Sequence, residues 1–403
     1  VTTRGVDIQI EAATDRREVL PGADIVVMTV GGGGRRAWEQ DVLIPRKYGI
    51  YQPGGDPAMP GGISRAMRMI PALLEIAQDV KAICPDCFFV NYSNPMTANC
   101  WAIRRGTGLD VVGLCHGVYD VERQLASFIG APLNEVTSLY AGLNHMTFLY
   151  DLRWQGRNAW PLVRARLAAE RGQPQEWEQV IQQFPQLDVS QARFKAADNP
   201  FSWSIFENYG AYPAVNDRHV VEFFPERFPE GRYYGKQLGV SAFSHEGTIV
   251  NGDKRYAEMR EQALGRQPLD TKIFQRAPGE HEQLTDILRS RANDTRRLFN
   301  VNLPNHGAVP NLPNDAILEM PAVGTATGLR PIQLLDFPDR LAALVIHKLA
   351  AVRLTVEAAL SGDRRLLVEA LLADGAVADP EVAQTLAADL LAAHRPYLPN
   401  FFG

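Results

Sequence analysis

The first 150 residues alternate short apolar runs with stretches whose apolar positions keep helical spacing. The runs at 23–30, 88–92 and 111–114 have the length and composition of buried strands. A helix is expected between the first two, starting at a Ser64 cap and ending at Cys84-Pro85. Its apolar positions are Ile70, Leu73, Leu74, Ala77 and Val80. This alternation is typical of βαβ units and predicts an α/β fold with a Rossmann-like parallel sheet.

The pattern changes near residue 156. Residues 161–195 are polar with helical spacing, and residues 199–250 are rich in aromatic side chains, proline and glycine. A long helix follows near the C-terminus, with Gly362 suited to end it and Asp363 to open the next. We therefore expect a Rossmann-like domain over residues 1–155 and a mixed α+β, mostly helical domain over residues 156–403.

Composition and charge exclude several classes of protein. The 403 residues carry 41 Lys and Arg against 46 Asp and Glu, a net charge of −5, so neither a nucleic acid nor an anionic membrane is expected as a partner. No apolar run approaches the 18 residues of a membrane span. Four cysteines in a chain of this length do not form a disulfide framework. These features favour a compact cytoplasmic protein.

Four consecutive glycines, Gly31 to Gly34, follow the first predicted strand. They do not satisfy the G-x-G-x-x-G fingerprint of a dinucleotide site, and a plain glycine turn is an alternative. The segment at 14–24 is like the one that precedes the fourth strand of dinucleotide-binding dehydrogenases, not the first. We therefore expect a loop that flanks a cofactor, in a Rossmann domain that lacks its first βαβ unit.

Two groups of side chains could carry chemistry. Cys115, His116 and His145 follow predicted strands and could supply a metal pair, although a buried thiol and a core histidine are the common reading. Asp56 and Asp217, with His219, lie in loops rich in glycine, proline and aromatic residues, where carboxylates usually face solvent or cap helices. The single C-x-x-C at 84–87 lacks the second pair of a structural zinc site.

Taken together, several segments resemble glycoside hydrolase family 4, the NAD- and metal-dependent glycosidases built on a lactate-dehydrogenase-like fold. The resemblance is closest to members that act on unphosphorylated α-glucosides, α-galactosides and α-galacturonides, and it runs from about residue 7 to the C-terminus. Each motif is short, but six occur in the family's order. They are residues 41–50 with 55–63, 91–96, 112–116, 141–145, 301–305 and 311–316.

The resemblance implies two cofactors and the residues that hold them. Cys115 and His145 would bind a divalent metal, usually Mn²⁺. Gly31, Gly32 and Asn91 would contact NAD. Bond cleavage in this family proceeds through oxidation at the sugar's C3, loss of the C2 proton, departure of the glycosidic oxygen and return of the hydride.

The remaining roles follow from the same resemblance. Asp217 would remove the C2 proton and Asp56 would be the acid. His116 stands where phospho-glycosidases carry Asp or Asn and joins the catalytic candidates. Asn94, His219 and Arg36, which lies just before Trp38, would contact the sugar. The departures at His116 and near Arg36 argue against a 6-phosphate substrate.

Two other functions stay open. An NAD-dependent hydroxyacid or sugar oxidoreductase would share the fold but has no need of a Cys–His metal pair. A catalytically impaired homologue, unable to bind NAD, would follow from a missing first βαβ unit. For the leading function we expect a small sugar or uronide as partner and a homodimer or homotetramer as the assembly.

Overall fold

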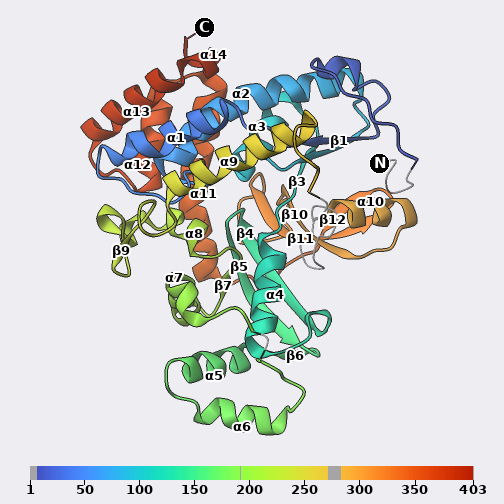
Figure 1. Cartoon of the computed structure of the whole chain (residues 1–403), viewed down its shortest axis with the longest axis vertical. Helices are drawn as coiled ribbons and strands as arrows, with labels where there is room; N and C mark the ends of the chain where they lie inside the picture. The colour runs from blue at the N-terminus through green and yellow to red at the C-terminus, as the bar shows by residue number, and fades with distance from the viewer. Residues whose placement is uncertain (1–6, 191, 271–282, 403) are drawn as a thin grey trace.

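The computed structural model describes residues 7–190, 192–270 and 283–402. Within them, one ten-stranded sheet runs through the centre of the molecule (Figure 1), in the order β1-β2-β3-β10-β11-β4-β5-β6. β12 and β7 pair with β11 and β5 beside this path. None of the helices in the described ranges is long and apolar enough to cross a membrane.

The first part of the sheet is parallel, as the sequence predicts. β1 (Ile25–Met28) pairs with β2 (Phe88–Asn91), and β2 pairs with β3 (Val112–Gly113). β2 is buried along its whole length, which explains its unbroken apolar run. The carboxyl ends of these strands therefore lie at one edge of the sheet, where open α/β sheets bind ligands.

The rest of the sheet is antiparallel and draws strands from both predicted regions. β10 (Leu298–Pro304) and β11 (Ile317–Thr325) lie between β3 and β4 (Val136–Leu143). The sheet thus joins residues before and after 155 in one layer. The other strands are β5 (Met146–Trp154), β6 (Arg157–Asn158), β7 (Tyr212–Pro213) and β12 (Gly328–Pro331), with β8 (Arg232–Tyr233) and β9 (Lys236–Gln237) in a separate hairpin.

Helices gather at one end of the molecule in Figure 1, where segments from both termini lie together. α2 packs on α3 and on α11, so the C-terminal region helps to cover the sheet. These helices are α1 (Gly34–Arg46), α2 (Met59–Ile83), α3 (Met96–Thr107), α9 (His245–Ala263), α11 (Asp339–Ser361), α12 (Arg364–Asp374), α13 (Pro380–His394) and α14 (Pro399–Phe402).

The opposite end carries α4 (Gly117–Ile129), α5 (Trp160–Glu170), α6 (Gln175–Gln183) and α7 (Pro200–Tyr209). A second apolar core lies here, separate from the main one, and it includes the fully buried Trp203, Phe206 and Tyr212. Two further helices, α8 (Asp217–Val220) and α10 (Leu284–Asn293), flank the sheet.

Several predicted helix boundaries are confirmed and one is wrong. Cys84 ends α2, Gly362 ends α11 with φ at 70°, and the Asp363 side chain accepts from the Arg365 N–H at 2.8 Å. Ser64 is not a cap, because α2 already begins at Met59. Its hydroxyl instead donates to the buried Asp41 carboxylate at 2.8 Å.

Candidate active site

A cavity of about 360 Å³ opens at the carboxyl ends of β1 and β2. This is the edge at which the sequence predicts ligand binding. Its walls come from the end of β1, the loop after β2, helices α1 and α2 with the segment between them, and α8. The lining residues are Thr29, Val30, Trp38, Gly54, Asp56, Arg65, Tyr92, Ser93, Asn94, Arg218 and His219.

Three potential metal ligands meet at this cavity. One ligand atom each from Asp56, His145 and His219 lies within 4.8 Å of the other two. The two imidazole rings are 4.3 Å apart between centroids. The Nδ1 atoms of both histidines are buried and make no hydrogen bond in the structure. Unpaired buried nitrogens that face a carboxylate are the arrangement that a cation would complete.

The turn between β4 and β5 holds His145 in position. His145 has φ at 67°, a left-handed conformation that a side chain with a Cβ rarely adopts. Such strain persists only where the surrounding structure enforces it, and it is commonly found at functional sites. The β4–β5 hairpin therefore fixes an imidazole that the sequence placed only near a strand end.

The protonation states suit metal ligation. Burial lowers the pKa of His145 to about 3 and also holds the pKa of His219 below its usual value. For Asp56, burial acts upward, but the charge of Arg65, whose Nη1 lies 2.9 Å from Oδ1, leads the groups that bring the pKa below its usual value. At neutral pH the cluster thus holds two neutral imidazoles and a carboxylate. This state favours Asp56 as a ligand or base over the acid role that we expected.

Cys115 lies beside this cluster but does not belong to it among the residues described. Its sulfur accepts from the Gly117 N–H at 3.4 Å. Burial, followed by the Glu319 charge, raises the thiol's pKa to about 12. The predicted Cys115–His145 metal pair stays a prediction, whereas the geometry brings Asp56 and His219 to His145.

Asp217 occupies a different environment from the one expected of a base. It is fully buried, and one carboxylate oxygen accepts from the Ser202 N–H at 2.7 Å and from the Ser202 hydroxyl. The other accepts from the Phe201 N–H at 2.8 Å and the Tyr233 hydroxyl at 2.6 Å. Asp217 therefore stabilises the N-terminus of α7 and is not among the cavity's lining residues.

Two other predicted residues lie on the surface. The His116 side chain is 61% exposed, with Nε2 at 3.7 Å from Asp120. Arg36 is 62% exposed on α1 and pairs with Glu39 and Asp253. Neither residue lines the cavity, although His116 lies near enough that, after burial, its charge also lowers the pKa of His145 and of His219.

Asn94 does lie at the site, and it contacts the cluster directly. Its amide donates to Asp56 Oδ2 at 3.1 Å, and its oxygen accepts from the Met96 N–H at 3.2 Å. Asn94 thus connects the loop after β2 to the carboxylate. Asn94 also lines the cavity, and its predicted contact with a sugar stays a prediction.

The residues predicted to contact NAD differ in their exposure and in how many of their polar groups the protein already uses. Gly31 is exposed, and nothing lies within 4 Å of where a Cβ would stand. The Gly32 N–H donates to Met69 Sδ, and its carbonyl accepts from Arg68. Asn91 is fully buried. Its side-chain amide donates to the Ser93 carbonyl and accepts from the Ser93 N–H, so it shapes the loop and has no exposed atom for a cofactor.

Sequence reasoning missed the residue that holds the Asp56 loop. Glu222 Oε1 accepts from the N–H groups of Gly54 and Gly55 at 2.7 and 2.8 Å, and Oε2 accepts from Asp56 N–H at 3.3 Å. Gly55 has φ at 56°, and a Cβ there would stand 2.6 Å from Gln52 Nε2. The sequence offered one signal for Glu222: it follows the candidate His219 by one helical turn, a spacing that predicts both residues on the same side of the chain.

Two arginines of the cavity were also missed. Arg65 pairs with Asp56 and lies over the Trp38 ring at 5.5 Å. Arg218 donates to the Thr248 hydroxyl at 3.1 Å, and the described residues include no carboxylate paired with it. Arg218 stands next to His219 in the sequence, but only the fold shows that both face the cavity.

Comparisons with known proteins identify the family and the fold. The family model for family 4 glycosyl hydrolases matches residues 1–131, and the model for their C-terminal domain matches residues 140–377. The chain is 30% identical to an α-galactosidase of Rhizobium meliloti, over 98% of this chain and 77% of that protein. It is 28% identical to an α-galacturonidase of Lachnoclostridium phytofermentans, over 97% and 84%.

The fold is also that of a solved 6-phospho-α-glucosidase from gut microorganisms, in complex with NAD and glucose-6-phosphate. The TM-score is 0.77 at 20% identity, covering 99% of this chain and 87% of that one. With both of its domain models matched in order along the sequence, this chain belongs to the family 4 glycosyl hydrolases.

Proposed function

We propose that the protein hydrolyses an unphosphorylated α-glycoside or α-uronide with NAD and a divalent metal, Mn²⁺. The observation that supports this most is the group of Asp56, His145 and His219 in one cavity with Asn94 and two arginines. The named activities of the related α-galactosidase and α-galacturonidase support the choice of substrate.

The residues at the cavity fit a divalent metal, and of the three residues predicted to contact NAD, Gly31 is the one that stays open. His145 and His219 would hold the metal through their unpaired nitrogens, with Asp56 as the third donor and Cys115 as the further ligand that the family resemblance implies. The loop at Gly31 leads from β1, whose end also lines the cavity through Thr29 and Val30. When bound, NAD would supply reversible hydride transfer and the metal would supply Lewis acidity.

The chain's own residues then act on the sugar. Asn94 orients it by hydrogen bonding beside Asp56. Asp56 is ionised and lines the cavity, so it can take up a proton at a carbon next to a carbonyl. His219 is neutral, so its one acceptor nitrogen can bind either the metal or a proton. Since Asp217 is enclosed by four donors, we assign the base role to whichever of Asp56 and His219 does not bind the metal.

Of the two arginines in the cavity, Arg218 bears on the choice between neutral and acidic sugars. Arg218 has no carboxylate partner among the described residues and faces the same space as Asn94 and His219. A guanidinium in this position would pair with the C6 carboxylate of a uronide. We therefore propose an α-uronide as the preferred substrate and a neutral α-glycoside as the weaker one.

One panel of assays tests the proposal. The purified chain is incubated with 4-nitrophenyl α-galactoside, α-glucoside, α-galacturonide and α-glucoside 6-phosphate, with NAD and Mn²⁺ added or withheld. The expected result is hydrolysis of the unphosphorylated substrates that requires both cofactors and leaves no net NADH. Full activity with a chelator and without NAD would contradict it, as would hydrolysis of the phosphorylated substrate alone. Net NADH production would indicate an oxidoreductase.

We also propose a cytoplasmic homodimer or homotetramer. All four cysteines are free, the state expected in a reducing compartment. Large apolar side chains on α9, including Tyr256 and Met259 at 62% and 66% exposure, are candidates for burial between subunits. Light scattering after size-exclusion chromatography measures the mass, and a monomer at micromolar concentration would contradict the assembly.

A further inference from the structure

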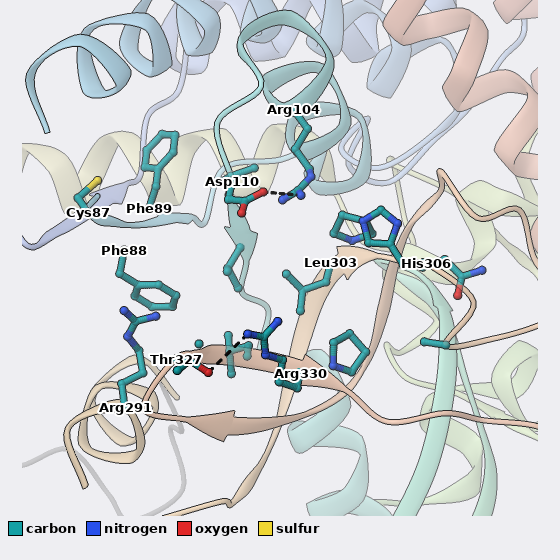
Figure 2. A pocket seen from close by; sticks show the side chains of 18 of the residues that line it. Cys87, Phe88, Phe89, Arg104, Asp110, Arg291, Leu303, His306, Thr327 and Arg330 are labelled. Carbon is teal, nitrogen blue, oxygen red and sulfur yellow. Dashed lines mark hydrogen bonds and ion pairs between the residues drawn. The ribbon is translucent and has the colours of Figure 1, made fainter. Parts of the chain in front are cut away.

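A second and larger cavity lies at the opposite end of the parallel strands. Its volume is about 750 Å³, within the range of small-molecule sites. It is formed where β2 and β3 begin, where β10 ends, and where β12 and α10 come beside them (Figure 2). None of its lining residues lines the candidate active site.

Two arginines reach this cavity without a carboxylate partner in the described chain. Arg291, on α10, holds its guanidinium 4.4 Å from the centre of the Phe88 ring. Arg330, on β12, has only a long contact of 3.5 Å to the Thr327 hydroxyl. This contact with the ring leaves the Arg291 N–H groups without a carboxylate partner among the described residues, so they are available to an anion.

A third arginine, Arg104, adds to the positive charge of the cavity. Arg104 enters from the side opposite Arg330 and pairs with Asp110 at 2.5 Å (Figure 2). The Asp110 side chain is 88% exposed, so this pair is open to water and its attraction is weak. His306 lies on a further side. The carboxylates at the cavity are Asp86 and Asp110, against three arginines.

The walls between these charges are apolar. The Phe88 ring from β2 forms one side, whereas the Phe89 ring points to the other face of the strand (Figure 2), and Leu303, Pro304 and Pro331 line another side. A ligand would therefore pack its body on aromatic and aliphatic surface while its charged groups reach the arginines. Because the two unpaired guanidiniums come from different elements, each can engage a separate anionic group.

We propose that this cavity binds a small organic molecule with two or more anionic groups, phosphate or carboxylate. Arg291 and Arg330 are its principal anchors, and Arg104 is shared with Asp110. The site lies outside the catalytic cavity, so the proposal does not depend on the glycosidase function.

The test uses the full chain and two probes, pyrophosphate and citrate, measured by titration calorimetry at fixed ionic strength. We expect saturable binding of at least one probe, and the tighter of the two identifies phosphate or carboxylate as the preferred group. Arg291→Gln and Arg330→Gln should each weaken that binding at least tenfold. Arg330 is exposed, so its variant should keep the fold, which circular dichroism checks.

Arg289→Gln is the matched control. Arg289 lies on the same helix as Arg291, is 76% exposed and pairs with Asp286 outside the cavity lining. Its variant should bind the probe as the unchanged chain does. Equal binding by all three variants would place the probe elsewhere, for example at the dinucleotide loop, and would overturn the proposal. The absence of saturable binding with both probes would do the same.

Discussion

His145 and His219 lie with their rings 4.3 Å apart at an interplanar angle of 37°, although 74 positions separate them in the sequence. Neither Nδ1 is hydrogen bonded, and both rings are neutral because burial lowers the pKa of each. A buried and a half-buried imidazole whose Nδ1 atoms have no hydrogen-bond partner lack the contacts that a purely structural pair would have. The relation points to a ligand between them and Asp56.

Loss of either imidazole should weaken metal binding. We expect His145→Gln and His219→Gln to lower Mn²⁺ affinity at least tenfold, measured by electron paramagnetic resonance titration. Cys115→Ala tests the ligand implied by the family resemblance in the same experiment. His347→Gln, an exposed position on α11, is the control. Unchanged affinity in His219→Gln would remove His219 from the site.

Asp217→Asn should destabilise the fold. The amide replaces one of two buried acceptor oxygens, and an N–H group of α7 or the Tyr233 hydroxyl loses its partner. Leaving buried donors unpaired costs about 1–3 kcal/mol each, so we expect a loss of about 2–4 kcal/mol in urea unfolding. Exchange of the sugar's C2 proton with deuterium should continue in the folded variant. Unchanged stability together with abolished exchange would restore Asp217 as the base.

His245 should make the protein acid-sensitive. Burial lowers its pKa to about 4 in the folded state, against about 6.5 when unfolded. Between these values only the unfolded chain binds the proton, so stability is complete above pH 6.5 and declines as pH falls toward 4. The slope from one such group is about 1.4 kcal/mol per pH unit. In His245→Phe, the free energy of unfolding should depend less steeply on pH between 4 and 6.5. An unaltered slope would refute His245 as the source of the acid sensitivity.

Arg218→Gln should separate acidic from neutral substrates. If its guanidinium pairs with a C6 carboxylate, the variant raises KM for the α-galacturonide at least tenfold and leaves KM for the α-galactoside within about twofold. Arg36→Gln is the comparison, since this arginine lies outside the cavity. An equal loss on both sugars would mean that Arg218 positions the loop and does not select the substrate.

Sequence patterns correctly predicted the features that depend on neighbouring residues, namely strands and helix ends. The apolar runs located β1 and β2, and Cys84-Pro85 and Gly362 marked helix ends, because each depends on a few neighbouring residues. Asp217 could not be assigned in this way, since the helix that it caps begins earlier in the chain, at Pro200. Proximity to a strand end suggested Cys115 and His145, but only the tertiary structure shows that His219 faces His145.

Ser64 illustrates the same limit within a helix. Its sequence context suits a cap, but the hydroxyl is used by Asp41, whose carboxylate also pairs with Arg68 at 2.5 Å and lies 2.9 Å from His394 Nε2. This buried network ties α1 and α2 to the end of α13. Spacing along the chain carries no information about partners more than 300 residues away.

The place of β10 and β11 in the sheet has a consequence for biosynthesis. Asn302 pairs with Gly113 across 189 positions, and Asn144 reaches Glu319 across 175. On the ribosome, β3 and β4, which are followed by Cys115 and His145, are therefore made long before the two strands that join them. Until about residue 325 has emerged, β3 and β4 keep open hydrogen-bonding edges, which invite pairing with other chains. Because the sheet closes late and through contacts between residues far apart in the sequence, we expect this enzyme to fold slowly. The open edges of β3 and β4 are where a chaperone could bind the unfinished chain.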